Sequence, residues 1–485
     1  MLKLKDASLL KQDAYIDGAW QPAANRFVVK NPASGETLAE VSDLGAEETA
    51  GAIKAAAAAF PAWSAKTAKD RAAIMRRWFD LMMANQEDLA QLMTAEQGKP
   101  LTESRGEIAY GAGFLDWFAE EAKRVYGDVI PAPKANQKIV VLKQPVGVVG
   151  AIAPWNFPNA MIARKVAPAI AAGCTIVVKP AEATPLSALA MAELGMRAGL
   201  PKGVLNIVTS SNPDAVGREL TTNPLVRKFS FTGSTAIGKK LMAQCASTVK
   251  KVSLELGGNA PFIVFADSDL DAAADGAMAS KFRNAGQTCV CANRLLVQDS
   301  IYDAFAEKIA ARVAKLKVGN GTEDGVTIGP LINAKAIEKV ERLIADALSR
   351  GAKIVTGGKR HALGGTFFEP TVLRDVTPEC ACAREEIFGP VVTLFKFKDE
   401  AEAIAMANDT EFGLAAYFYA RDVGRIMRVA EGLDYGIVGI NEGLISTEVA
   451  PFGGMKESGI GREGSKYGIE DYLEIKYLAL GGLDK

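Results

Sequence analysis

Apolar residues recur with different periods along the chain, and each period predicts a different kind of element. Residues 13–45 carry short alternating runs around Asp17-Gly18, a signal typical of a tight hairpin. Between Gly45 and Arg124 apolar residues lie three and four positions apart, which is the spacing of amphipathic helices. The N-terminal part is therefore expected to hold a hairpin followed by a helical region.

A strand-and-helix rhythm occupies most of the remaining chain. In a first block, residues 145–258, apolar strands are predicted at residues 146–153, 174–178, 204–208, 228–231 and 249–254. In a second block, residues 260–454, strands are predicted at residues 261–265 and 295–297 and a helix at 301–316. Apolar strands that alternate with helices favour parallel sheets covered on both faces, so the predicted fold class is α/β.

Two further strands, residues 136–144 and 470–480, lie outside both blocks. Unattached strands of this kind are candidates for pairing with each other or with a second subunit. The sequence thus predicts a small β element beside the two α/β blocks.

Composition narrows the class of protein. At 485 residues, with 49% hydrophobic and 23% charged side chains, the chain has core material for about two or three domains. Its net charge of −1 argues against a nucleic-acid partner or a charged membrane surface. No apolar run approaches the ~20 residues that span a bilayer, and the N-terminal residues lack the apolar core of a signal peptide. A cytoplasmic protein is expected.

The six cysteines and the single histidine, His361, limit the chemistry. Without a secretion signal the cysteines are expected to be reduced, and one histidine with no C-x-x-C motif argues against a metal site. Cysteine proteases need a histidine beside the thiol, whereas His361 lies in a polar stretch that predicts a solvated loop. Hydrolysis by a thiol–histidine pair is therefore disfavoured.

Cys289 is the candidate nucleophile. Most cysteines are small packing residues, but residues 286–288 place this one on a polar turn. Glu255 ends an apolar strand before two glycines and is a candidate general base, because burial would raise its pKa toward the useful range. The alternative is a salt-bridged or solvent-facing strand end. Asn156 offers an amide donor, although on its own a turn-forming asparagine is the better interpretation.

A cofactor site is indicated where strands meet helices. Gly233 and Ser234 lie between a strand and a helix, where a glycine and a hydroxyl suit a phosphate, although the run lacks the G-x-G-x-x-G pattern. Lys179 ends another strand, and Glu182 follows three residues later. The lysine could contact a ribose or a phosphate, and the carboxylate could bind ribose hydroxyls.

Five motifs, taken together and in order, resemble those of the aldehyde dehydrogenase superfamily across essentially the whole chain. They are Pro154-Trp155-Asn156-Phe157-Pro158, Leu254-Glu255-Leu256-Gly257-Gly258, Gly286-Gln287-Thr288-Cys289, Glu386-Ile387-Phe388-Gly389-Pro390 and Pro451-Phe452-Gly453-Gly454. Within the superfamily, residues 281–294 and 461–468 most resemble succinate-semialdehyde dehydrogenases. The resemblance implies a Rossmann-like cofactor-binding domain, a second α/β catalytic domain and a small β oligomerisation element, in a homodimer or tetramer. The expected bounds are residues 1–122 and 146–257, residues 258–457, and residues 123–145 and 470–485, respectively.

The resemblance also implies roles for the candidate residues. Cys289 would attack the aldehyde carbon, Asn156 and the Cys289 backbone N–H would hold the oxyanion, and Glu255 would activate the water that hydrolyses the thioester. NAD or NADP would accept the hydride. The implied cofactor contacts are Trp155, Lys179, Glu182, Gly233, Ser234, Leu256, Glu386 and Phe388.

Substrate choice is expected to rest on Arg164 and Arg283, with Ser446 as a third contact. These residues resemble the carboxylate-binding set of the semialdehyde enzymes, and a guanidinium suits the far carboxylate of succinate semialdehyde. Glutarate semialdehyde stays open, because hydrophobic pockets separate substrates one methylene apart by only ~10–200-fold. A broad aldehyde dehydrogenase is a further alternative. A catalytically silent protein of this fold is the non-enzymatic one, and the intact set of Cys289, Glu255 and Asn156 argues against it.

Glu182 and the remaining cysteines raise separate questions. Several bacterial relatives that prefer NADP carry a small residue where this chain has Glu182, and a carboxylate near the adenosine ribose repels a 2′-phosphate, which favours NAD. Cys291 is either a packing cysteine or the redox partner in a reducible Cys289–Cys291 disulfide. Cys380 and Cys382 match no motif and are expected to be structural.

Overall fold

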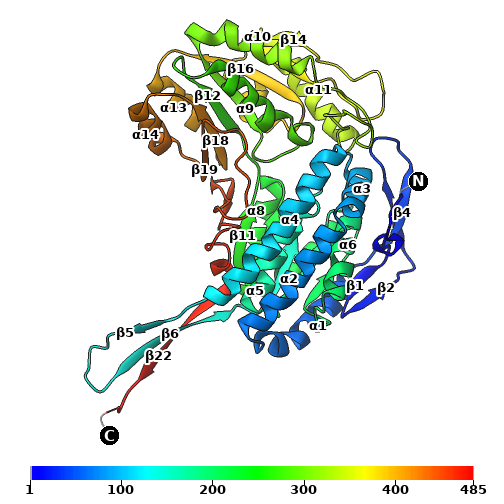
Figure 1. Ribbon diagram of the computed structural model, residues 1–485, viewed down its shortest axis with the longest axis vertical. Helices are drawn as coiled ribbons and strands as arrows, with labels where there is room; N and C mark the ends of the chain where they lie inside the picture. Colours follow the sequence, from blue (N-terminus) through cyan, green and yellow to red (C-terminus); the bar gives the residue numbers. More distant parts are fainter. Residues whose placement is uncertain (1–2, 484–485) are drawn as a thin grey trace.

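The computed structural model describes residues 3–483 and contains two helix-covered sheets and a projecting arm (Figure 1). In the view of Figure 1 one sheet lies in the lower body and the other in the upper body, and the arm leaves the lower body toward the C-terminus. Two short ribbons, β3 (Arg26–Lys30) with β4 (Thr37–Ser42) and β17 (Phe412–Gly413) with β20 (Met455–Lys456), complete the strand pairs. The predicted α/β class is confirmed.

The lower sheet reverses its strand order at β7. Its spatial order is β2 (Ala19–Gln21), β1 (Ala14–Ile16), β9 (Leu205–Ile207), β8 (Thr175–Lys179), β7 (Val148–Ile152), β10 (Val226–Thr232), β11 (Lys251–Glu255) and β21 (Gly459–Ile460). Strands β7 to β11 are mutually parallel, and the others pair antiparallel at the edges. Ligands of parallel sheets bind beyond the carboxyl ends of the strands at such a reversal.

Helices cover both faces of the lower sheet because its central strands are apolar on both. Val148 and Val177 belong to a buried cluster with helices on one face, whereas their neighbours Val149 and Val178 belong to the core on the other face. The helices are α1 (Ala46–Ser64), α2 (Ala68–Ala84), α3 (Gln86–Gln97), α4 (Leu101–Glu121), α5 (Ala160–Ala172), α6 (Pro185–Arg197), α7 (Pro213–Thr222) and α8 (Thr235–Cys245). This is the buried parallel sheet that the sequence predicts.

The upper sheet carries the second predicted block. Its order is β14 (Lys353–Thr356), β15 (Thr371–Arg374), β16 (Val391–Phe397), β13 (Ala292–Gln298), β12 (Ala260–Val264), β18 (Ala415–Tyr419) and β19 (Ile437–Ile440), with only β14 antiparallel among the described strands. Its helices are α9 (Leu270–Phe282), α10 (Tyr302–Val313), α11 (Ala334–Ser349), α12 (Ala381–Arg384), α13 (Glu400–Asn408) and α14 (Val423–Gly432). Because the chain passes from the carboxyl end of β11 to the amino end of β12 across residues 256–259, strand ends of both sheets meet between the two bodies.

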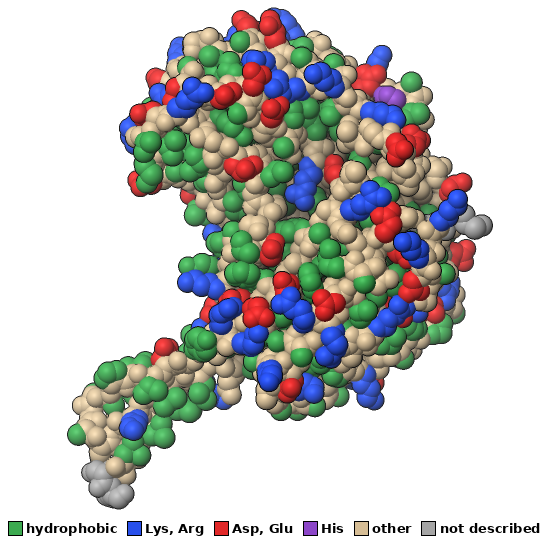
Figure 2. Space-filling model, in the orientation of Figure 1, with side chains coloured by type: hydrophobic (Ala, Val, Ile, Leu, Met, Phe, Trp, Pro, Cys, Tyr) green, Lys and Arg blue, Asp and Glu red, His purple; other side chains and the backbone are tan. Residues whose placement is uncertain are grey.

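The arm is a three-stranded sheet in the order β22 (Leu473–Leu480), β6 (Lys138–Pro145) and β5 (Asp128–Ile130). Strands β6 and β22 pair antiparallel from Leu473 opposite Pro145 to Leu480 opposite Lys138, which confirms that the two unattached strands pair with each other. Figure 2 shows apolar side chains along the arm. The exposed apolar residues of its strands include Val129, Ile475 and Tyr477. No helix in residues 3–483 is long and apolar enough to cross a membrane.

Local conformation shifts several predicted boundaries. The hairpin is confirmed, with Asp17 and Gly18 in left-handed conformation between β1 and β2. The strand predicted from Val249 begins instead at Lys251, because Val249 closes a short 3₁₀ turn with φ 51° and is 91% exposed. The helix predicted to reach residue 316 ends at Val313, and β22 begins only after a 3₁₀ turn at Glu470–Tyr472.

Candidate active site

A cavity of about 360 Å³ lies where the strand ends of the two sheets meet. Most of the predicted site residues line it: Trp155, Asn156, Arg164, Gly233, Ser234, Leu256, Arg283, Cys289, Glu386, Phe388 and Ser446. Four predicted residues, Lys179, Glu182, Glu255 and Cys291, are not among the described residues of its wall. The fold thus brings side chains from both bodies, which are far apart in the sequence, together in one cavity.

The loop that presents Cys289 has an unusual backbone. Between α9 and β13, Asn284, Ala285 and Gly286 all have positive φ, at 52°, 54° and 76°. Positions of this kind cost about 1–3 kcal/mol each in residues other than glycine and persist only where surrounding contacts hold them. A Cβ at Gly286 would collide with the Gly389 carbonyl, and Gln287 ties the loop to the Ile332 N–H at 3.0 Å. These contacts hold the partly exposed Cys289 in the cavity wall.

The surroundings of the Cys289 thiol favour its neutral form. Burial raises its pKa to about 12; the Glu386 carboxylate acts in the same direction, and the Arg164 guanidinium opposes it. Because the thiolate is the reactive form, attack by Cys289 requires a group that accepts its proton.

Glu255 meets the requirement of a buried base but lies behind the cavity wall. Its residue exposure is 3%, and neither carboxylate oxygen has a hydrogen-bond partner within residues 3–483. Burial raises its pKa well above the usual glutamate value, and repulsion from Glu463 adds to the rise. The solvent-facing alternative is therefore wrong. A Cβ at Gly453 would lie 3.0 Å from Glu255 Oε1, so this glycine leaves room beside the carboxylate.

Asn156 is tied to the loop of the nucleophile. Its Nδ2 donates to the Gln287 carbonyl at 3.0 Å, and Asn284 Nδ2 donates to the Asn156 backbone carbonyl at 2.9 Å. A side-chain amide carries two N–H donors, so one hydrogen fixes the group and the other is available to a ligand in the cavity. Asn156 is therefore more than a turn-forming residue.

The carboxyl edge of the lower sheet fits a dinucleotide. Strand pairing sets Ile152 beside both Lys179 and Phe231, and Thr232 beside Glu255, so the ends of β8, β7, β10 and β11 are neighbours. Ser234 is the N-cap residue of α8 but its side chain makes no cap hydrogen bond, and Thr232 Oγ1 has no hydrogen-bond partner in the described chain. The open helix N-terminus and the free hydroxyl suit a phosphate.

Trp155, Phe388 and Glu386 add aromatic rings and a carboxyl group to the proposed dinucleotide site. The rings of Trp155 and Phe388 lie edge to face with centroids 5.7 Å apart. Glu386 accepts the Gly258 N–H at 3.3 Å, and burial raises its pKa to about 7. Lys179 and Glu182 lie outside the cavity at the end of β8, joined by an ion pair of 3.6 Å, and the Glu182 side chain is 55% exposed.

The polar part of the cavity is cationic. Buried Arg164, on α5, pairs through Nε with Glu463 at 2.6 Å, while its Nη2 has no hydrogen-bond partner in the described residues. Lys165 binds the same carboxylate at 2.7 Å, so two cations share one anion. The Arg283 guanidinium lies 4.7 Å from the centre of the Phe157 ring. With Ser446 in the same wall, the cavity offers an anion unpaired donors and net positive charge.

The remaining cysteines and His361 are not among the described residues that line the cavity. Cys291 Sγ donates to the carbonyls of Ser280 and Lys281 at 3.2 and 2.9 Å, and all six thiols are free, so the disulfide stays a prediction. Cys380 and Cys382 are buried in the core of the upper sheet, as expected of structural residues. His361 lies in a loop, where its Nδ1 accepts the Leu363 N–H.

Sequence reasoning missed several wall residues. Lys335 and Lys339 line the cavity from the first turns of α11, and Tyr110 lines it from α4. The two lysines are four residues apart and hence share a helix face, but that spacing is equally typical of a solvated surface. The buried Lys99 and Glu107 behind Asn156 also gave no signal in the sequence.

Comparison with known proteins identifies the family to which the chain belongs. Residues 20–478 match the model of the aldehyde dehydrogenase family. The chain is 66% identical to glutarate-semialdehyde dehydrogenase of Pseudomonas aeruginosa and 64% identical to succinate-semialdehyde dehydrogenase [NADP(+)] GabD of Escherichia coli, each over 99% of this chain and 100% of the relative. The crystal structure of succinate-semialdehyde dehydrogenase from Burkholderia pseudomallei matches with a TM-score of 0.98 and 65% identity, over 99% of this chain and 100% of that one. The chain therefore belongs to the aldehyde dehydrogenase family and is an NAD(P)-dependent aldehyde dehydrogenase.

Proposed function

We propose that the protein oxidises succinate semialdehyde to succinate. The observation that carries this proposal is the presence of Arg164 and Arg283 in the same cavity wall as Cys289. A short aldehyde bound at Cys289 would extend its far carboxylate toward Arg164 Nη2, which has no hydrogen-bond partner among residues 3–483. The Escherichia coli relative is named for this substrate.

Glutarate semialdehyde is the second candidate, because the Pseudomonas aeruginosa relative is named for it. The two substrates differ by one methylene, and such a difference changes binding by only ~1–3 kcal/mol in a hydrophobic pocket. Both candidates require the same cationic wall, so both predict that an uncharged aldehyde of similar length is a poor substrate.

The first chemical step forms a bond between Cys289 Sγ and the aldehyde carbon. The thiol proton passes to Glu255, whose carboxylate must first reach the cavity by side-chain rotation or through a water. The carbonyl oxygen becomes an oxyanion, which the second N–H of Asn156 Nδ2 and the backbone N–H of Cys289 stabilise. Donors of this kind are worth about 3–4 kcal/mol in acyl-transfer enzymes.

When bound, NAD(P) would accept the hydride whose loss turns the thiohemiacetal into a thioester on Cys289. Trp155, Gly233, Ser234, Leu256, Glu386 and Phe388 would hold the cofactor within the cavity, and Lys179 and Glu182 would hold it at the end of β8. Glu255 must first release the thiol proton to solvent. It then takes a proton from water, the hydroxide attacks the thioester carbon, the C–S bond breaks, Cys289 regains a proton from Glu255 and the carboxylate product leaves.

The remaining organisation belongs to the same proposal. Residues 1–122 and 146–257 would form the cofactor-binding domain, residues 258–457 the catalytic domain, and residues 123–145 and 470–485 the oligomerisation element. The exposed apolar side chains of Val129, Ile475 and Tyr477 on the arm support association into a dimer or tetramer. A cytoplasmic location stays a prediction, which the six free thiols support.

The test compares kcat/KM for succinate semialdehyde, glutarate semialdehyde and butanal, each with NAD and with NADP. Butanal is the matched control because it has the carbon count of succinate semialdehyde without the charge. Arg283→Ala should raise KM for both semialdehydes and leave butanal nearly unchanged. Equal losses on charged and neutral aldehydes, or butanal as the best substrate of the wild type, would refute the proposal.

A further inference from the structure

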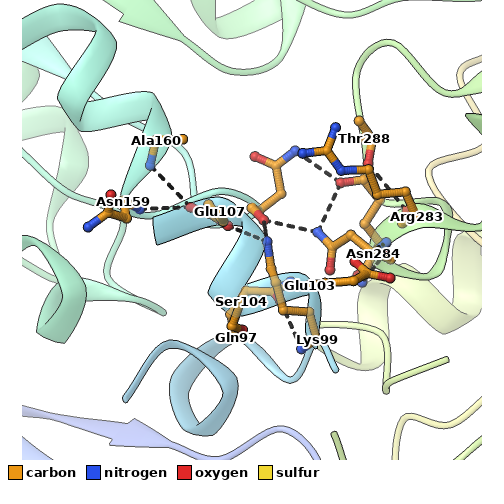
Figure 3. A network of polar contacts seen from close by, with 12 residues as sticks. Gln97, Lys99, Glu103, Ser104, Glu107, Asn159, Ala160, Arg283, Asn284 and Thr288 are labelled. Atoms are coloured by element: carbon orange, nitrogen blue, oxygen red, sulfur yellow. Dashed lines mark hydrogen bonds and ion pairs between the residues drawn. The ribbon is translucent and has the colours of Figure 1, made fainter. Parts of the chain in front are cut away.

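A fully buried lysine lies directly behind the oxyanion donor. Lys99 occupies the short connection between α3 and α4, and its side chain is 0% exposed. Its ammonium donates to Glu107 Oε2 at 2.5 Å and to the backbone carbonyl of Asn156 at 2.7 Å, and it lies 3.8 Å from the centre of the Phe157 ring. Figure 3 shows Lys99 in contact with Glu107 of α4, which in turn contacts Asn159 and Ala160.

Glu107 also binds the segment that follows Asn156. While Oε2 binds Lys99, Oε1 accepts the backbone N–H groups of Asn159 and Ala160 at 2.9 and 3.1 Å. These amides begin α5, which has no side-chain cap of its own. The pair therefore holds the segment 156–160 at both ends: the lysine binds its first carbonyl and the glutamate binds its last amides.

The same helix face also holds the loop of the nucleophile. Glu103 lies one turn before Glu107 on α4, and its Oε2 accepts the backbone N–H of Asn284 at 2.8 Å. Asn284 is the first residue of the left-handed stretch that leads to Cys289, and its own amide donates to the Asn156 carbonyl. Helix α4 thus binds the backbone of two segments: the start of α5, which follows Asn156, and the loop that leads to Cys289 (Figure 3).

We propose that Lys99, together with Glu107, is a positioning residue that sets the Asn156 amide against Cys289. The proposal rests on the proposed oxyanion role of Asn156 and nucleophilic role of Cys289. Lys99 touches neither substrate nor reacting atoms and acts through the Asn156 backbone. Its effect should therefore fall on the chemical step, for aldehydes with and without a charge.

A buried ion pair such as Lys99–Glu107 contributes little to the free energy of unfolding. The cost of removing two charges from water largely cancels their attraction, and apolar replacements are often neutral or stabilising. Burial lowers the pKa of Lys99, and Glu107 opposes that effect. A charge-assisted donor gives a stiff, short contact, which suits a site where a misplacement of about 1 Å costs roughly 100-fold in rate.

The test is the double variant Lys99→Met/Glu107→Gln, which removes both charges and keeps an acceptor for Asn159 and Ala160. In stopped-flow measurements, the first-turnover rate of reduced cofactor formation should fall ~10–100-fold, with KM for the cofactor nearly unchanged. Asn156→Ala alone should cost ~100–1,000-fold. In the Asn156→Ala background the double substitution should cost less than ~3-fold more, because its target is already absent.

Glu96→Gln is the matched control. Glu96 is also fully buried and holds the N-terminus of another helix, through the N–H groups of Leu186 and Ser187, but it lies outside the network of Figure 3. Its replacement should leave the first-turnover rate unchanged. If the double variant does not fold, Glu107→Gln alone is measured in both backgrounds and judged by the same criterion.

Equal losses in the wild-type and Asn156→Ala backgrounds would make the pair merely structural and overturn the proposal, as would no loss at all. If Asn156→Ala itself keeps full activity, the oxyanion role fails and the positioning role fails with it. Failure of the semialdehyde proposal is separate. It would show in the ranking of succinate semialdehyde against butanal, on which Lys99 and Glu107 should have no influence.

Discussion

Alkylation of Cys289 in the free enzyme should depend steeply on pH. The thiol pKa is raised to about 12, mainly by burial and then by Glu386. At pH 7 a thiol with this pKa is ionised in roughly 10⁻⁵ of the molecules. Because iodoacetamide reacts with the thiolate, the labelling rate should rise about 10-fold for each pH unit between pH 7 and pH 9.

Two substitutions should move this rate in opposite directions. Glu386→Gln removes the carboxylate that raises the pKa of the Cys289 thiol, so labelling at a fixed pH should become faster. Arg164→Met removes the cation that lowers it, so labelling should become slower. A general loosening of the cavity would accelerate labelling in both variants, and the opposite signs exclude that explanation.

The assay quantifies the alkylated peptide that contains Cys289 by mass spectrometry, with Cys289→Ala as the background for the other thiols. Each reaction is stopped before a tenth of the protein is labelled, so that the initial rate is measured. A labelling rate that is flat between pH 7 and pH 9 would show that the thiol is already ionised and would refute the reasoning.

Four further predictions concern Glu255, Glu182 and Cys291. Glu255→Gln should slow both the first-turnover burst of reduced cofactor and thioester hydrolysis, each ~100–10,000-fold, because the residue accepts a proton in both steps; a burst at the wild-type rate would confine its role to hydrolysis. Since the raised pKa of Glu255 leaves it protonated at low pH, the wild-type steady-state rate should rise with pH above the usual glutamate range, and a flat profile down to pH 5 would contradict this. Glu182→Ala should improve kcat/KM with NADP relative to NAD; an unchanged ratio would mean that the exposed carboxylate does not discriminate. Peroxide inactivation should be reversed by dithiothreitol in the wild type and not in Cys291→Ser, and a wild type that dithiothreitol does not restore would exclude the disulfide.

The site residues that lie at the carboxyl ends of parallel strands were predictable from the sequence. Parallel strands bring their carboxyl ends to one edge, so Lys179, Gly233 and Glu255 could be grouped from the sequence before any coordinates. Segment boundaries were less predictable. Val249 is a β-branched residue beside an apolar run, which favours a strand, yet the preceding 3₁₀ turn forces it to a positive φ and out to solvent.

The positioning network was not predictable, and the reason is physical. Lys99 lies between Gly98 and Pro100, a sequence typical of an exposed polar turn, and lysine is almost never fully buried without a partner. Its partners are 8 and 57 residues away in the chain, and Glu103 binds a residue 181 positions away. Local periodicity reports only neighbours within about one or two turns, so it cannot reveal a charge whose burial is decided by three separate segments. Cys289 and Glu255 can be recognised from the residues next to them in the sequence. Lys99 acquires a role only when α4, the Asn156 turn and the nucleophile loop are packed together. Residues that position a catalytic group from behind are therefore to be sought in the tertiary structure, among buried charges that bind the backbone of a catalytic turn.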